Sequence, residues 1–373
     1  MVRKQFLSFL LIFSLLISCA SALAETDDDD DWDDNVDDAW EMEHPLHSGD
    51  YAYALLDDGT VEITSYGGAD TEIVIPDTLD GKPVTAIGER AFYYSLSLTS
   101  VTIPDSVTHI SQKAFSCCFQ LTSITLPSGL TAIESGTFDL CKSLTTIDIP
   151  DSVAAIADDA FIGCKALQSF TLSPNHPYFF LADDALCRTA DSTLLLYPNA
   201  RENRTYRIPD GIAAISAYAF YDCDLLESVV IPDSITQIPE RAFYGCSALA
   251  SVSLPDSLTE IGIAAFSGCS ALTGNRIPAA ITEIINHTFS GCTSLATLEI
   301  PDSVTKIGDY AFFGCTSLTS IAIPDSVTAI GNGAFSNCTA LTLTVTPDSY
   351  AAEYAKANNI PYTYPDANDW LNN

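Results

Sequence analysis

The sequence predicts a repeat solenoid built mainly from β-strands, and three periodic features predict it. A proline, usually preceded by Ile or Leu, recurs every 23 residues. A phenylalanine keeps the same step, and a cysteine follows most of these phenylalanines by three residues. A fixed period of this length is typical of solenoids, and we expect about eleven coils. The repeat phenylalanines are Phe92, Phe115, Phe138, Phe161, Phe220, Phe243, Phe266, Phe289, Phe312 and Phe335.

The first stretch, residues 1–24, is predicted to be an export signal. It has a positively charged start, an apolar run over 6–17, and small residues Ala22 and Ala24 that suit cleavage by a signal peptidase. The apolar run is shorter than the roughly 20 residues that a membrane-spanning helix needs. As an alternative, Cys19 ends a lipobox-like sequence and would carry a lipid anchor. Both alternatives predict a secreted or cell-surface protein.

The charge of the chain excludes some partners. There are 49 Asp and Glu against 15 Lys and Arg, which gives a formal net charge of −34. Nucleic acid and acidic membranes are therefore not expected as partners, because phosphates are bound by clustered cations. The acidic residues concentrate in 25–49, which we interpret as a disordered linker, since blocks of like charge repel each other.

Next in the chain, residues 50–75 are predicted to form an N-terminal cap hairpin. The strand-like runs 51–55 and 61–64 flank the turn signal Asp57-Asp58-Gly59. A solenoid needs such an atypical end coil to keep its first core layer from water.

The solenoid itself is predicted over 76–346. In each coil the pattern L-x-x-I-x-I-P indicates a short strand that ends at the proline, which cannot donate to a ladder. A second extended piece, V-T-x-I, and an A-F-x-G-C turn follow. Equivalent strands of successive coils then pair in parallel, about 4.8 Å apart. The first coil carries five extra residues around Asp80 and Gly81.

One insertion, 174–205, interrupts the array. We interpret 181–186 and 193–197 as two strands of a hairpin that elaborates one coil, and insertions of this kind often bind ligands. Residues 347–373 are predicted to be a C-terminal cap and tail, with a short helix over 349–358 followed by a strand over 360–364.

The cysteines form a ladder in the same frame, with one residue per coil. Buried free thiols are the favoured interpretation, because free cysteine packs as a small apolar residue. Occasional disulfides between neighbouring coils, or a metal site, remain alternatives. Cys117 and Cys187 lie off the ladder and are predicted to be the reactive thiols. The ladder consists of Cys118, Cys141, Cys164, Cys223, Cys246, Cys269, Cys292, Cys315 and Cys338.

The repeat unit I-P-D-S-V-T-x-I-G-x-x-A-F-x-G-C-x-x-L-T-S-I resembles the BspA-type leucine-rich repeat over about residues 50–364. This resemblance implies a right-handed superhelix with a parallel sheet on its concave face. It also implies an exported or surface protein, in a family with members implicated in adhesion to host matrix proteins or other microbes. The chain departs from the pattern at the insertion and at Asn275, which replaces an inward apolar residue and predicts a local distortion.

No catalytic motif, cofactor site or metal site is found, so we predict a non-enzymatic protein. Its expected ligand is a protein or glycan on another cell or matrix. A self-associating structural component is one alternative. An enzyme with its site in 174–205 is another, and it would need His176 close to Asp183 or Asp184. The candidate ligand-binding residues are Thr102, Thr125, Asp148, Thr171, Tyr178, Phe179 and Tyr197.

Overall fold

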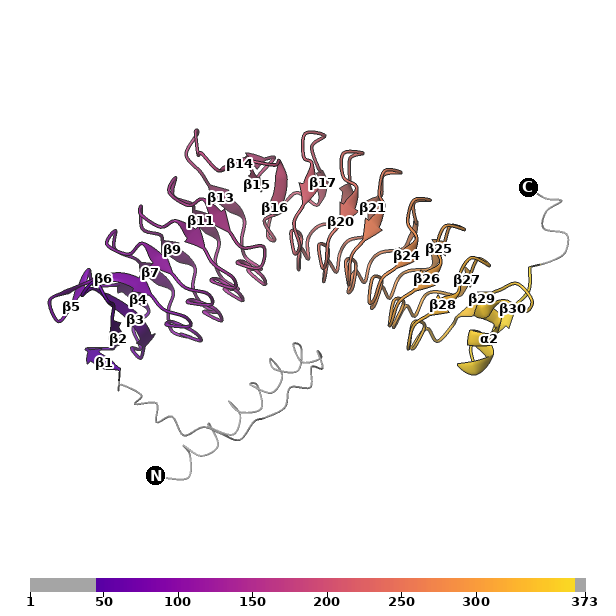
Figure 1. Cartoon of the computed structure of the whole chain (residues 1–373), viewed down its shortest axis with the longest axis horizontal. Coiled ribbons are helices and arrows are strands. Elements are labelled where there is room, and N and C mark those ends of the chain that lie inside the picture. The colour runs from indigo at the N-terminus through magenta and orange to yellow at the C-terminus, as the bar shows by residue number, and fades with distance from the viewer. Residues whose placement is uncertain (1–44, 366–373) are drawn as a thin grey trace, which may run out of the picture. The chain divides into compact units, whose positions relative to one another are not determined.

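The computed structural model describes residues 45–365, which form a solenoid of about 13 turns of about 23 residues each (Figure 1). The predicted fold class is confirmed. The predicted number of coils, about eleven, was too low. The turns in the two caps and in the insertion lack the repeat phenylalanine. Tyr66 and Tyr197 take its place in the aromatic stack, and Tyr354 closes the stack edge-on against Phe335. The predicted export signal, with Cys19, Ala22 and Ala24, and most of the linker lie outside the described residues.

The strand that each proline ends is three residues long and pairs in parallel with its counterpart in at least one neighbouring coil. Within the described chain this pairing is interrupted between β9 and β11, β13 and β17, β21 and β23, and β25 and β27. The register is one period in most pairs, as for Ser100 and Ser123. Its central residue points into the core and the outer two face away. The strands are β4 (Glu72–Val74), β7 (Ser100–Thr102), β9 (Ser123–Thr125), β11 (Thr146–Asp148), β13 (Ser169–Thr171), β17 (Thr205–Arg207), β19 (Ser228–Val230), β21 (Ser251–Ser253), β23 (Gly274–Arg276), β25 (Thr297–Glu299), β27 (Ser320–Ala322) and β29 (Thr342–Thr344).

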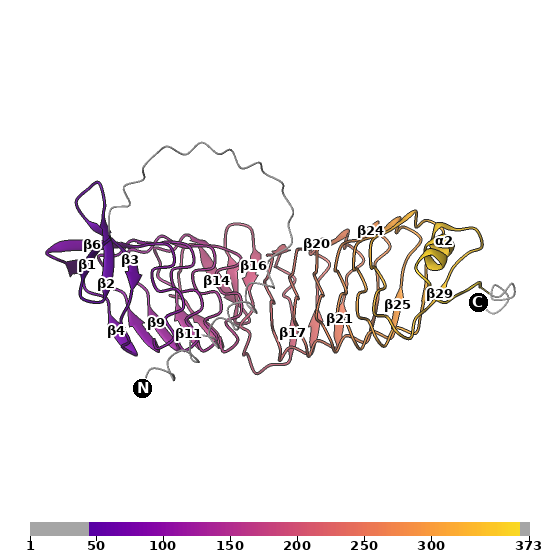
Figure 2. The ribbon, with the colours of Figure 1, turned by 90° about the horizontal axis from the view of Figure 1, so that it is seen from below.

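The V-T-x-I piece forms a second, two-residue strand in each regular coil, as predicted. Figure 2 shows β20 and β24 of this set along the edge opposite β17, β21 and β25. These strands also pair in parallel. They are β8 (His109–Ile110), β10 (Ala132–Ile133), β12 (Ala155–Ile156), β18 (Ala214–Ile215), β20 (Gln237–Ile238), β22 (Glu260–Ile261), β24 (Glu283–Ile284), β26 (Lys306–Ile307) and β28 (Ala329–Ile330).

The N-terminal cap contains the predicted antiparallel hairpin, which joins β2 (Tyr51–Leu55) to β3 (Val61–Tyr66). It also contains β1 (Leu46–Ser48), which pairs with β2, so ordered structure begins inside the range assigned to the linker. The five extra residues of the first coil form a small hairpin of β5 (Thr78–Leu79) and β6 (Lys82–Ile87). Its turn, Asp80–Gly81, has positive φ at both residues.

The core is organised around the stacked repeat phenylalanines. Neighbouring rings within each run lie 4.7–5.9 Å apart between centroids and are nearly parallel. The stack breaks once, because Phe161 meets Phe170 edge-on rather than continuing to Tyr197. On the two sides of this break the buried apolar residues form two separate clusters. The solenoid therefore has two cores.

The insertion fills the layer between these cores. It consists of β14 (Phe179–Ala182), β15 (Ala185–Arg188) and β16 (Thr193–Leu196), which form an antiparallel sheet; β16 also pairs in parallel with β18. Leu186 belongs to the N-terminal core, and its neighbour Cys187 belongs to the C-terminal one. The insertion is therefore a two-faced internal layer. The prediction of a single strand over 181–186 was wrong, because the Asp183–Asp184 turn has positive φ at both residues and divides it.

The C-terminal end follows the prediction. Helix α2 (Tyr350–Ala357) begins after Ser349, whose side-chain oxygen accepts a hydrogen bond from the Ala352 N–H at 3.2 Å, as expected of an N-cap residue. Its buried alanines close the last core layer. Strand β30 (Tyr362–Thr363) then pairs in parallel with β29.

Asn275, where a local distortion was predicted, lies at the centre of β23, which still pairs with β25 in the 23-residue register. Backbone pairing does not join β21 to β23, but within the described chain it is equally absent between β9 and β11 and between β25 and β27, so this gap is not specific to Asn275. The Asn275 Nδ2 donates to the Val252 carbonyl at 3.2 Å, and its Oδ1 accepts from the Arg276 N–H at 2.9 Å. The amide is therefore satisfied by backbone groups, and the predicted distortion does not set this coil apart.

Candidate binding surface

The outward positions of the three-residue strands form a row that runs along the solenoid. Of the four predicted residues in it, Thr125, Asp148 and Thr171 are exposed and Thr102 is half-exposed. They follow one another at the third position of β7, β9, β11 and β13. None of the four makes a side-chain hydrogen bond to another described residue. By contrast, the hydroxyl of Thr122, just before β9, donates to the Thr99 carbonyl at 2.8 Å. The third-position groups are therefore the ones available to a ligand.

The aromatic part of the predicted site is only partly on the surface. Tyr178 is 44% exposed, but Phe179 and Tyr197 are each 2% exposed. Phe179 packs in the N-terminal core and Tyr197 continues the aromatic stack toward Phe220 at 5.2 Å. Phe179 and Tyr197 cannot reach a ligand, and their prediction as binding residues was wrong. The sequence did not reveal which neighbour in the Tyr-Phe-Phe run would turn inward.

His176 is a buried structural residue. Its Nε2 lies 3.0 Å from the Pro150 carbonyl, and its Nδ1 accepts hydrogen bonds from the N–H groups of Tyr178 (3.3 Å) and Phe179 (3.2 Å). These contacts match a neutral ring with the proton on Nε2 and use both nitrogens. The carboxylates of 183–184 pair elsewhere. The geometry that an enzyme in the insertion would need is therefore not formed.

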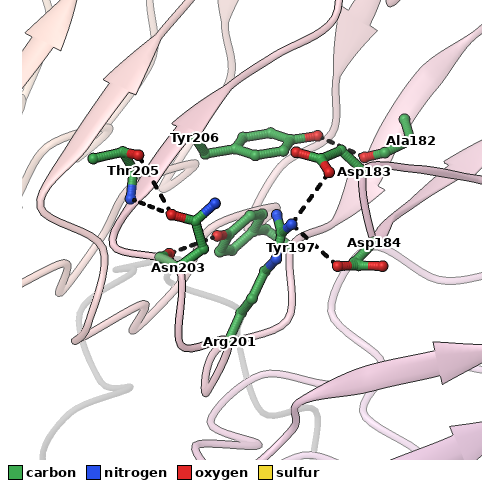
Figure 3. A network of polar contacts seen from close by, with 8 residues as sticks. All are labelled: Ala182, Asp183, Asp184, Tyr197, Arg201, Asn203, Thr205 and Tyr206. Atoms are coloured by element: carbon green, nitrogen blue, oxygen red, sulfur yellow. Dashed lines mark hydrogen bonds and ion pairs between the residues drawn. The ribbon is translucent and has the colours of Figure 1, made fainter.

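Arg201 receives those two carboxylates, as Figure 3 shows. Its Nη2 lies 3.3 Å from Oδ1 of Asp183 and 3.1 Å from Oδ2 of Asp184. The guanidinium also lies against the rings of Tyr197 and Tyr206, at 5.7 and 5.8 Å from their centroids. Arginine stacks well on aromatic faces. This contact fastens the β14–β15 turn to the loop after β16.

The hydroxyls of the same two tyrosines are anchored by backbone. The Tyr206 O–H donates to the Ala182 carbonyl at 2.9 Å, and the Tyr197 O–H donates to the Asn203 carbonyl at 3.2 Å (Figure 3). Burial raises the pKa of Tyr206, so the phenol stays protonated and keeps donating. The hydrogen bonds and ion pairs of this network hold the β14–β15 turn against the loop after β16, and we interpret the network as structural.

The row of third positions changes character after the insertion. In β17, β19, β21 and β23 it reads Arg207, Val230, Ser253 and Arg276, so two long cations flank two short side chains. A depression of about 500 Å³ lies between them. The sequence analysis missed it. The available signal was that Arg207 and Arg276 stand three whole periods apart in a chain with few cations.

The ladder cysteines are buried thiols, as the favoured interpretation predicted. Each Sγ donates to the carbonyl of the aromatic residue 26 positions earlier, as Cys246 does to Phe220 at 3.0 Å. Within residues 45–365 all cysteines are free, and all but the half-buried Cys338 are buried. Cys117 and Cys187 were predicted to be reactive, and they are buried too. Burial raises the pKa of Cys118 and of Cys187 to about 12, so neither forms thiolate readily at neutral pH.

These thiols should resist modification until the chain unfolds. Alkylation of the native protein at pH 8, mapped by peptide mass spectrometry, should label Cys338 first and the others slowly, whereas guanidinium should expose all of them. Even at pH 9 native labelling of the buried thiols should remain far slower than that of an exposed thiol with an ordinary pKa of about 8.5. Rapid native labelling of Cys117 or Cys187 would contradict their burial.

No group of three or more His, Cys, Asp or Glu residues within 45–365 is arranged to hold a metal ion. Over the same range, no helix has both the length and the apolar character needed to cross a bilayer.

Comparison with known proteins places this architecture in a family. The profile described as "BspA type Leucine rich repeat region" matches residues 71–181 and 207–347, in six copies. No curated protein sequence matches the chain. A leucine-rich cell-surface protein from Faecalibacterium prausnitzii is 30% identical, with 84% of this chain and 97% of that chain covered, at a TM-score of 0.49.

Two further solved structures resemble the chain in fold. A leucine-rich repeat protein from Eubacterium ventriosum is 24% identical, over 78% of this chain and 93% of that one, at a TM-score of 0.59. The pneumococcal vaccine antigen PcpA is 17% identical, over 87% and 99%, at 0.62. Because the family profile covers well over half of the chain and leaves out the divergent insertion, the protein belongs to the BspA-type leucine-rich repeat family.

Proposed function

We propose that this protein is exported and acts, without enzymatic activity, by binding a macromolecule on another cell or on extracellular matrix. The observation that carries the proposal is the continuous row of outward side chains on the three-residue strands. Repeat proteins use such extended surfaces to bind large partners, because every coil adds a further contact. The row is largely polar, and the hydroxyl groups of its third-position Thr and Ser residues make no side-chain hydrogen bond to another described residue.

The family supports the location. A relative that is 30% identical is described as a cell-surface protein, which agrees with the predicted export signal. The acidic surface keeps the chain soluble and disfavours polyanionic partners. The geometry of His176 removes support for an enzyme in the insertion, since both of its ring nitrogens bond to backbone groups.

Binding of the purified protein to an array of matrix proteins and glycans tests the proposal. Deleting 174–205 is an unsuitable variant, because Leu186 and Leu195 in it are core residues. We expect Thr125→Arg or Ser253→Arg, one on each side of the insertion, to weaken binding at least about tenfold by placing a bulky charge on the row. Thr108→Arg is the matched control, at an exposed position just before the two-residue strand β8.

The outcomes separate the alternatives. Weakening by a row variant but not by the control supports the proposal. Equal binding by all three variants, or no binding to any array member, would overturn it. Self-association is measured by light scattering on the same samples. If the row variants abolish self-association and leave array binding unchanged, the row is a contact between copies instead.

A further inference from the structure

The depression between Arg207 and Arg276 has the features of a built site on this row. Both arginines are largely exposed, with side chains 62% and 55% accessible. Strands about 4.8 Å apart put three coils, or roughly 14 Å, between them. Val230 and Ser253 line the depression between the arginines. The length suits several units of a linear ligand, and the hollow is open along one side of the solenoid.

Each arginine is held in place by an aspartate, Arg207 by one three residues later in the chain and Arg276 by one in the preceding coil. Nη2 of Arg207 bonds to Asp210 at 2.9 Å, and Nη2 of Arg276 bonds to Asp256. A guanidinium has five N–H donors, so each pair leaves donors free beside carboxylate oxygens that can still accept. Such pairing fixes the side chains and lowers the entropy that would be lost when a ligand binds.

The charge pattern selects among ligands. Asp233 also lines the hollow and has no ion-pair partner within the described chain, so the five charged residues carry three negative and two positive charges. A free anion at either arginine would meet an aspartate already in place, and a free cation would meet the arginines. A neutral chain of hydroxyl groups meets neither conflict, because each hydroxyl both donates to a carboxylate and accepts from a guanidinium.

Asn275 is an independent sign that this coil is shaped for a purpose other than stability. Its position in the other three-residue strands holds Val, Ile, Phe, Tyr or Leu. Here an amide forfeits the apolar burial of the other coils, and Asn275 itself is only half-buried. The Asn275 Oδ1 bonds to the N–H of Arg276, whose side chain reaches back to Asp256. Local departures from a consistent fold are expected at functional sites.

We infer that the hollow between Arg207 and Arg276 binds a neutral oligosaccharide. The inference rests on the proposed function and specifies its ligand. Arg207 and Arg276 would donate to sugar hydroxyls, Asp233 would accept from them, and Asn275 would act as a positioning residue for Arg276.

The test is calorimetric titration of the protein with neutral oligosaccharides chosen from the glycan array, beside matched sugars that bear carboxylate or sulfate. We expect neutral sugars to bind, and the double variant Arg207→Ser, Arg276→Ser to lose at least about tenfold in affinity. Lys306→Ser, which removes one positive charge from an exposed residue in the other ladder, should change nothing. Asn275→Val should raise the unfolding midpoint while it weakens sugar binding, a combination that a merely structural role would not give.

Several results would overturn the inference. Preference for the anionic sugars would show that the hollow recognises negative charge on its ligand. Unchanged sugar affinity in the double variant would place the site elsewhere, and unchanged affinity in Asn275→Val would remove the positioning role. If Thr125→Arg weakens array binding while the Arg207/Arg276 double variant and Asn275→Val do not, the proposed function stands and only this inference fails. If the array shows no binding at all, both fail.

Discussion

Replacing Phe266 with alanine should destabilise the C-terminal core by about 3–5 kcal/mol. Phe266 is 0% exposed and lies between Phe243 and Phe289, at 5.3 and 5.7 Å between ring centroids. The substitution removes a buried ring and leaves a cavity that the neighbouring rings cannot fill, because backbone ladders hold their spacing. Phe313→Ala is the matched control. That ring is half-buried on the outside of a turn, so we expect a clearly smaller loss.

Hydrogen exchange read by mass spectrometry shows where the loss falls. Faster exchange in Phe266→Ala should spread through coils 206–345 and leave coils 61–165 near their wild-type rates. The reason is that a solenoid is stabilised by contacts between nearest neighbours, and the insertion separates the two apolar clusters. Uniformly faster exchange over both ranges would show that the insertion transmits stability as well as an ordinary coil does.

Few side-chain contacts cross the break outside the insertion itself. Lys165, before it, forms ion pairs with Asp222 (3.3 Å) and Asp224 (2.9 Å), after it. These residues are partly exposed, and ion pairs of this kind contribute little to stability. Cooperativity between the halves must therefore come mainly from β15 and β16, each of which contributes residues to both cores.

The periodic part of the fold could be predicted because each repeat position has one environment. A residue found every 23 positions must stack on its own copies, so the aromatic stack, the thiol ladder and both strand sets follow from the period. Both caps could also be predicted, because turn and N-cap signals such as Asp57-Asp58-Gly59 and Ser349 are local.

The non-periodic part could not be predicted in the same way. Whether Tyr178 or Phe179 turns inward depends on where the antiparallel strand begins, and that depends on positive φ values at Asp183 and Asp184. The partner of a charged side chain is likewise set in three dimensions: Arg276 bonds to Asp256, which is 20 residues earlier and not one period away. The depression between Arg207 and Arg276 therefore forms only once the coils are stacked.

Ionisation of Asp139 should lower the free energy of unfolding as the pH rises. Its carboxyl is largely removed from water, and this burial is the main reason that its pKa rises to about 6; nearby Asp159 also acts to raise the pKa, while Lys113 and a 3.5 Å hydrogen bond from Ser116 act to lower it. In the unfolded chain an aspartate has a pKa of about 3.9. The folded state thus binds the proton more tightly. Its stabilising contribution is complete below about pH 3.9 and is lost as the pH rises through about 6.

Asp139→Asn removes this titration and should stabilise the protein by about 1–2 kcal/mol at pH 7.5, after a reduction for partial exposure of the side chain. Urea unfolding at pH 4, 5.5 and 7.5 should show the gain over the wild type growing with pH and nearly vanishing at pH 4. Comparing variant with wild type cancels the general repulsion of so acidic a chain. Asp148→Asn, on an exposed side chain in the next strand, should stay within about 0.5 kcal/mol at every pH. A gain for Asp139→Asn that is equal at all three values would mean that packing, and not ionisation, accounts for it.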